Sequence, residues 1–110
     1  MGKMNYIGQI LDNRIVAHCS DKAACETLLA MGASHKVFDR KRLEFKAESK
    51  EALARALERL RDAGFLFVGG SSGWPPSAVF ASLRDEGLVE GTINVVTWRA
   101  KNDPVVEEAR

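Results

Sequence analysis

The amino-acid sequence predicts a single α+β domain in which about three helices pack on a mainly antiparallel sheet of four or five strands. Three observations support this prediction. Two short apolar runs near the amino terminus are joined by a tight turn, which is typical of a β-hairpin. Three amphipathic segments each end at a glycine, as helices commonly do. Strands and helices interleave in the order ββαβαβαβ, which together with the hairpin indicates the α+β class.

Length and composition limit the chain to one core. It has 110 residues, of which 45% are hydrophobic and 28% charged, which is typical of a folded globular domain. We expect residues 1–100 to form this domain. Residues 101–110 are polar apart from Val105 and Val106, so we expect them to be a loosely ordered tail.

The charge balance and the cysteine content limit the partners and the cellular location that we expect for the protein. Sixteen Lys and Arg against fifteen Asp and Glu give a net charge of +1, so no global field draws the chain to nucleic acid or to an anionic membrane. No stretch has the pattern of a membrane span or a leader, so we expect a cytoplasmic location. Cys19 and Cys25 are too few for a disulfide scaffold, and we expect reduced thiols. Their spacing and that of the histidines predicts no metal, and no cofactor is expected.

The first half of the chain begins with the hairpin. Its strands are expected at Asn5–Leu11 and Arg14–Cys19, because Asp12 and Asn13 between them tolerate a positive φ. Ser20 is expected to cap the first helix, at about Asp21 to Met31.

An alternating pattern follows from His35 to Ala47, which indicates one strand or a hairpin bent near Asp39 to Lys41. Ser49 is expected to cap the second helix, which has the clearest amphipathic pattern and ends at Gly64. Its apolar stripe consists of Leu53, Ala56, Leu57 and Leu60.

The second half contains two strands and a third helix. Phe65 to Val68 is fully apolar and predicts a buried strand. The third helix has Val79, Phe80 and Leu83 on its apolar face. Thr92 to Arg99 is rich in β-branched residues and predicts the last strand. Left exposed, that strand would pair with its copy, so a homodimer is expected.

Two elements are candidates for partner binding. The first is a rigid apolar knuckle, typical of an interface anchor, although a tryptophan at this place can also pack in the core. It consists of Trp74, Pro75 and Pro76. The second is the only concentrated basic run, which suits an acidic protein surface or a nucleic-acid backbone but also fits a solvated strand face. It consists of Lys36, Phe38, Arg40, Lys41 and Arg42.

The glycine-rich segment before the third helix is a candidate phosphate loop, because backbone N–H groups at the start of a helix attract anions. Its residues are Gly69, Gly70, Ser71, Ser72 and Gly73. The spacing matches neither the P-loop nor the dinucleotide-binding pattern, and no lysine follows that would reach a phosphate.

Residues 77–89, followed by a strand, resemble the stretch from recognition helix to wing in winged-helix regulators. The resemblance implies nucleic-acid binding by the carboxy-terminal half. That family has a short helix before the recognition helix, and here the glycine-rich segment takes its place.

We therefore expect a non-catalytic interaction module that binds a macromolecular partner, first of all a protein, as an inhibitor, an adaptor or an immunity-type regulatory protein does. No nucleophile elbow, Ser/His/acid pattern or compact carboxylate pair indicates an enzyme. The alternatives are a nucleic-acid-binding regulator and a small enzyme or nucleotide-binding protein that uses the glycine-rich segment.

Overall fold

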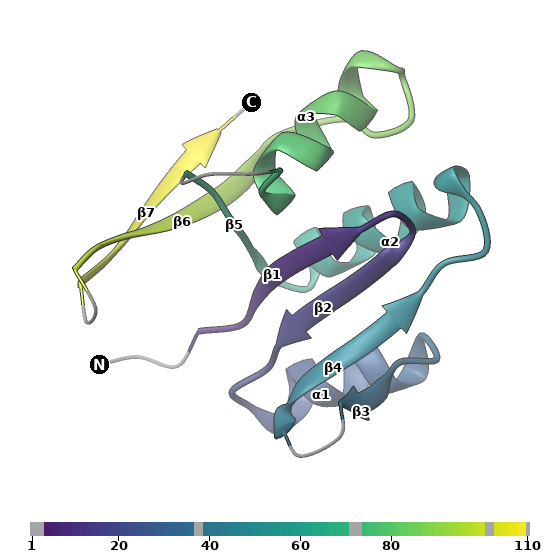
Figure 1. The fold of residues 1–110 in the computed structure, drawn as a ribbon, viewed down its shortest axis with the longest axis vertical. Coiled ribbons are helices and arrows are strands. Elements are labelled where there is room, and N and C mark those ends of the chain that lie inside the picture. Colours follow the sequence, from purple (N-terminus) through teal and green to yellow (C-terminus); the bar gives the residue numbers. More distant parts are fainter. Residues whose placement is uncertain (1–3, 37–38, 71–73, 101–102, 110) are drawn as a thin grey trace.

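The structure, a computed structural model, describes residues 4–36, 39–70, 74–100 and 103–109. Its elements alternate along the chain as shown in Figure 1. They are β1 (Tyr6–Leu11), β2 (Arg14–His18), α1 (Lys22–Ala30), β3 (Ser34–Lys36), β4 (Asp39–Lys46), α2 (Lys50–Asp62), β5 (Leu66–Val68), α3 (Pro76–Asp85), β6 (Ile93–Ala100) and β7 (Asp103–Ala109).

The α+β class with three helices is confirmed, but the sheet differs from the prediction. Within the described ranges the sheet has seven strands in the order β3-β4-β2-β1-β5-β6-β7, and it is mixed. The pairs β1–β5 and β5–β6 are parallel, whereas the others are antiparallel. The reason is that α2 and α3 are crossover helices, and a helical crossover connects strands that run in the same direction.

The strand β7 lies in the segment that the sequence analysis placed in the tail. It pairs antiparallel with β6 from Ile93↔Ala109 to Ala100↔Asp103. Strand β6 therefore has a neighbour on each side, so the condition under which Thr92 to Arg99 was expected to pair with its copy is not met. The edges of the sheet are β3 and β7.

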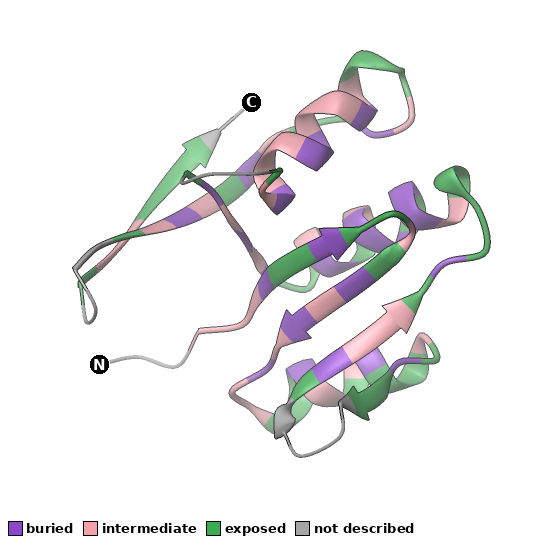
Figure 2. Ribbon diagram, viewed as in Figure 1, coloured by how far each residue is buried: buried purple, intermediate pink, exposed green. Residues whose placement is uncertain are grey.

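All three helices contribute to one core on a single face of the sheet (Figure 2). Ile7, Ala17, Leu43 and Phe67 point to this face from neighbouring strands and are buried. The helices cover them with Leu28, Leu57, Leu60 and Phe80. In Figure 1, α1 and α2 lie behind the sheet, and α3 packs against β1 and β5 next to α2.

Local signals account for the ends of the elements. Ser49 caps α2 as predicted, with its side-chain oxygen accepting a hydrogen bond of 3.1 Å from the backbone N–H of Ala52. Asp12 turns the β1–β2 hairpin at a φ of 54°, as the sequence indicated. The cap of α1 is Asp21 and not Ser20, because the Ser20 hydroxyl donates to the carbonyl of Met4 instead.

No helix in the described part of the chain has the length and apolar character needed to cross a bilayer.

Candidate functional site

No helix in the described residues covers the face of the sheet opposite the core, and a row of side chains crosses this face. Tyr6 on β1 lies opposite His18 on β2, and His18 lies opposite Arg42 on β4. Since successive side chains of a strand point to opposite faces, this row lies on the other side from Ile7 and Leu43. We call this side the open face.

Tyr6 contacts two other rings on the open face. The rings of Tyr6 and His18 are stacked, with centroids 4.9 Å apart and planes 11° from parallel. Trp98 on β6 meets Tyr6 edge to face at 5.5 Å. The indole of Trp98 is 38% exposed, and the other two rings are partly buried. We call Tyr6, His18 and Trp98 the aromatic platform.

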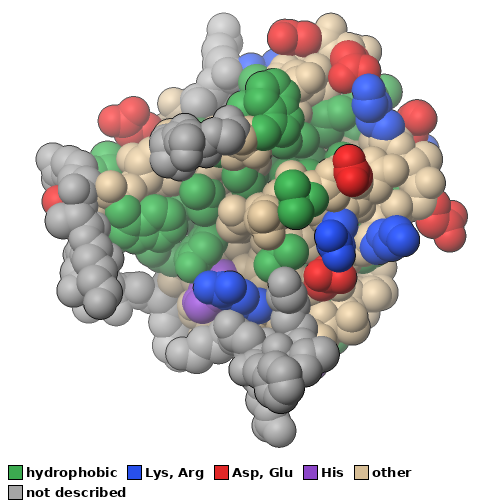
Figure 3. Space-filling model, in the orientation of Figure 1, with side chains coloured by type: hydrophobic (Ala, Val, Ile, Leu, Met, Phe, Trp, Pro, Cys, Tyr) green, Lys and Arg blue, Asp and Glu red, His purple; other side chains and the backbone are tan. Residues whose placement is uncertain are grey.

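A groove of about 360 Å³ runs along the platform. Besides the three rings, its lining consists of Gly8, Gln9, Val16, Ala17, Arg42 and Val68. None of these lining residues is a carboxylate, and Arg42 contributes a cation. In Figure 3, hydrophobic side chains gather on this side of the molecule next to a histidine and basic side chains.

Gly8 leaves room in the groove. The register of β1 against β2 shifts between Ile7 and Gln9, so Gly8 sits in a bulge. A Cβ atom at Gly8 would lie 3.7 Å from the ring of Tyr6 and 3.9 Å from the carbonyl oxygen of Val16, which is ordinary contact. A larger side chain can therefore be placed there to obstruct the groove without a backbone clash.

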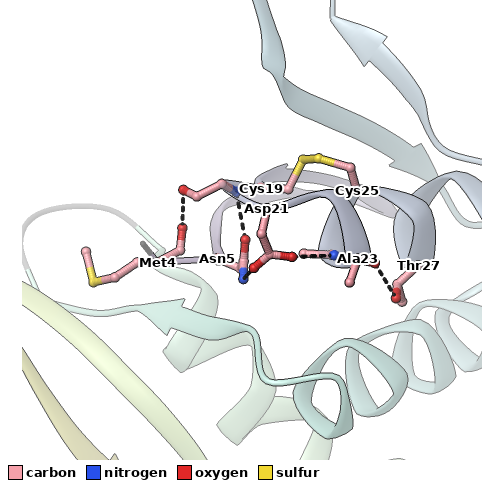
Figure 4. The surroundings of a disulfide bond; sticks show 9 residues. Met4, Asn5, Cys19, Asp21, Ala23, Cys25 and Thr27 are labelled. Atoms are coloured by element: carbon pink, nitrogen blue, oxygen red, sulfur yellow. Dashed lines mark hydrogen bonds between the residues drawn. A yellow bond between two sulfur atoms is a disulfide. The ribbon is translucent and has the colours of Figure 1, made fainter. Parts of the chain in front are cut away.

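A hydrogen-bond network holds the strand ends from which two of the rings project (Figure 4). The Asn5 amide donates to the carboxylate of Asp21 at 2.9 Å, and its oxygen accepts from the backbone N–H of Ser20 at 2.7 Å. Asn5 directly precedes Tyr6, and Ser20 follows His18 by two positions. The cap of α1 thus fixes the start of β1 to the end of β2, where the two rings stack.

A disulfide between Cys19 and Cys25 reinforces the same region (Figure 4). It links the residue after β2 to α1, with the Cα atoms 5.5 Å apart. The expectation of two reduced thiols is therefore wrong. The separation of six residues matches no recognised cysteine motif, so the sequence contained no sign of the bond. The bond forms because α1 lies close enough to the end of β2 to bring the two Cα atoms within the usual distance of a disulfide.

Reduction of this disulfide is expected to lower the free energy of unfolding by about 2 kcal/mol. The crosslink restricts the unfolded chain, and for a loop of this size its removal returns conformational entropy to the unfolded state that is worth about this much. The measurement is urea unfolding with and without a thiol reductant. The double variant Cys19→Ala, Cys25→Ala is the control, and its unfolding should not respond to the reductant. If the free energy of unfolding of the wild-type protein were also the same with and without reductant, the prediction would be contradicted.

The predicted knuckle is found on a different surface. Trp74 is 64% exposed, so it does not pack in the core, whereas Pro76 is buried in the first turn of α3. Trp74 lines a second groove, of about 430 Å³, together with Lys50 and Glu86. These two form an ion pair of 2.8 Å, and the hydrogen bond from Lys50 to Glu86 raises the pKa of Lys50 above its ordinary value.

Only one side chain of the predicted basic run lies in the described part of the chain. Phe38 and the side chains of Lys36, Arg40 and Lys41 lie outside it. Arg42 is exposed and lines the groove of the open face. The two grooves share no lining residue, so the structure separates Trp74 from Arg42.

The candidate phosphate loop is described only at its first two residues, and Ser71, Ser72 and Gly73 lie outside the described residues. The N–H of Gly69 already donates to the carbonyl of Val96 on β6, at 3.0 Å. Gly69 therefore extends the ladder of the sheet and has no N–H left for a phosphate.

The segment that resembles a recognition helix is α3, which connects the parallel strands β5 and β6. In the described residues no short helix precedes it, and its apolar face packs on the sheet. Nor does any group of three His, Cys, Asp or Glu residues in the described ranges have the arrangement of a metal site.

Sequence reasoning did not find the aromatic platform. Its three rings come from Tyr6, His18 and Trp98, which are far apart in the sequence. The available signal was the alternation within each strand, but the order of the strands had to be known before the three positions could be joined.

No protein family, no curated protein and no solved structure matches this chain.

Proposed function

We propose that this protein is a non-catalytic interaction module that binds a macromolecular partner through the open face of its sheet. The observation that carries the proposal is the cluster of three aromatic rings that lines a groove on that face. Exposed aromatic clusters are typical of binding surfaces, where they supply contact area at low cost in conformational entropy. An inhibitor, an adaptor or an immunity-type regulatory protein acts in this way.

The chemistry of the groove favours binding over catalysis. Its described lining contains a phenol, an imidazole and a guanidinium, and it includes no carboxylate or thiol. Both cysteines are held in the disulfide, so neither is a nucleophile in this state.

A second candidate surface is the groove at Trp74. The most exposed of the large hydrophobic side chains described is the indole of Trp74, and it stands next to the ion pair of Lys50 and Glu86. An exposed tryptophan with charged neighbours is a common interface anchor. The two tryptophans therefore define competing binding surfaces on one molecule.

Photo-crosslinking in the native cell tests the proposal. A benzophenone amino acid at Gln9, an exposed residue of the groove, should capture a macromolecule, whereas the same group at Arg55, exposed on α2, should not. Trp98→Leu should reduce the capture from Gln9, and Trp74→Leu should leave it unchanged. Capture from Gln9 that is lost in Trp74→Leu but not in Trp98→Leu would select the second surface, and no capture from Gln9 would refute binding through the open face.

A cytoplasmic location, expected from the sequence, is also open to test. Disulfides are rare in a reducing cytosol. A cytoplasmic protein should therefore have both thiols reduced, whereas a protein with the closed Cys19–Cys25 bond has no free thiol. Acid quenching of native cells followed by alkylation distinguishes them. Two alkylated cysteines per chain would support the cytoplasmic location, and none would contradict it.

A further inference from the structure

We propose that the partner of the open face is a single-stranded nucleic acid whose unpaired bases stack on the aromatic platform. This inference rests on the proposed function and names its partner. Tyr6 and His18 already form a stack, with planes 11° from parallel, and a base added to it continues that geometry. Aromatic side chains on an open sheet face bind bases in this way, because every base has a π-face.

The charges of the groove complement a polyanion. Arg42 is exposed and lies directly opposite His18, beside the stack. The described lining adds no carboxylate that would repel a phosphate. Glu44, two residues along β4, forms an ion pair of 3.8 Å with Arg14, so its charge is partly offset. A cation beside a stack of rings is the combination that single-strand binding requires.

The same features argue for single strands over duplexes. A base pair inside a duplex is stacked on both sides and offers no free face to a protein ring. One described cation in the groove also neutralises few phosphates, so backbone attraction alone gives weak binding. Stacking must therefore supply the larger part of the affinity, which makes binding depend on unpaired bases.

Fluorescence anisotropy measures this preference directly. The probes are a fluorescein-labelled single strand of about 12 nucleotides, as RNA and as DNA, and the DNA duplex of the same sequence. At about 50 mM salt we expect at least one single strand to bind roughly tenfold or more tightly than the duplex. Equal affinity for both would overturn the inference, because it would indicate contact with the backbone alone.

Tryptophan fluorescence reports on stacking itself. The chain has two tryptophans, Trp74 and Trp98, so a Trp74→Phe protein emits from Trp98 only. The single strand should quench this emission as it binds. In the matched Trp98→Phe protein, which keeps an aromatic ring at the platform, binding should persist while the emission of Trp74 stays unchanged. Binding without any change in Trp98 emission would overturn the inference.

Three substitutions separate stacking from charge. Trp98→Leu keeps an apolar side chain but removes the ring, and it should weaken binding by roughly 5- to 150-fold, whereas Trp74→Leu should have no effect. Arg42→Gln should reduce the slope of log affinity against log salt by about 0.7. Gly8→Leu should obstruct the groove and weaken binding with all three rings in place. Thermal melting of each variant excludes loss of the fold as the cause.

The outcomes distinguish this inference from the proposed function. If no single strand binds but a protein is crosslinked from Gln9, the nucleic-acid inference is overturned and the binding function of the open face remains. If neither a strand nor a protein is captured, both fail. Binding of single strands that is insensitive to Trp98→Leu would also overturn the inference.

Discussion

Phe80→Ala is expected to lower the free energy of unfolding by about 3–5 kcal/mol, because truncation of a buried aromatic removes its burial and leaves a cavity. Phe80 on α3 is fully buried and meets the ring of Phe67 on β5 edge to face at 5.2 Å. The guanidinium groups of Arg61 and Arg84 lie over its ring at 5.9 Å and 5.5 Å. The substitution therefore removes contacts that join α2, α3 and the centre of the sheet.

Urea denaturation followed by circular dichroism measures this loss. Leu29→Ala is the matched control, because Leu29 is a large apolar residue on a helix but is exposed, and its truncation should change the stability by less than about 0.5 kcal/mol. A loss of less than about 1 kcal/mol for Phe80→Ala would mean that the packing of α3 on β5 is not as described.

Gly69→Ala is expected to destabilise the protein by about 1–3 kcal/mol through a steric clash. A Cβ atom at Gly69 would lie 2.4 Å from Cγ1 of Val95 and 3.0 Å from Oγ of Ser77. The backbone cannot easily move away, because the Gly69 N–H is bonded to the carbonyl of Val96 and continues the ladder between β5 and β6. The β-branched side chain of Val95 has few alternative rotamers with which to relieve the contact.

A double-mutant cycle isolates this clash. Adding Val95→Ala to Gly69→Ala removes the obstructing methyl group, so the pair should be less destabilised than the sum of the two single variants. Gly8→Ala is the control for glycine replacement, since its Cβ meets only ordinary contacts and should cost far less. Strict additivity of Gly69→Ala and Val95→Ala would contradict the close approach of the two residues.

Local features of the fold were predictable from the sequence because they depend on neighbouring residues. The hairpin turn at Asp12 and the cap of α2 at Ser49 each rest on a few adjacent residues, and the structure confirms both. The cap of α1 was misplaced by one residue, since Ser20 and Asp21 are both good caps. The carbonyl of Met4 decides between them, because it accepts a hydrogen bond from the Ser20 hydroxyl and leaves Asp21 to cap the helix. Met4 is distant from both residues in the sequence.

The candidate site was only partly predictable. Arg42 was selected from the basic run, and it lines the groove of the open face. The rings beside it, Tyr6, His18 and Trp98, were not selected, because nothing in their own segments distinguishes them from ordinary strand residues. They become a platform only when β6, two strands away from β1, brings Trp98 to the ring of Tyr6.

By itself the sequence determined the α+β class, the three helices and the apolar positions that fill the core, because periodicity and capping act over a few residues. The tertiary structure alone decided the mixed order of the strands, the inclusion of β7, the Cys19–Cys25 bond and the meeting of three rings on the open face. These features depend on which strands become neighbours. The order of the strands is set by the need to bury one common apolar face under the helices. That need involves the whole chain, so no single segment reveals it.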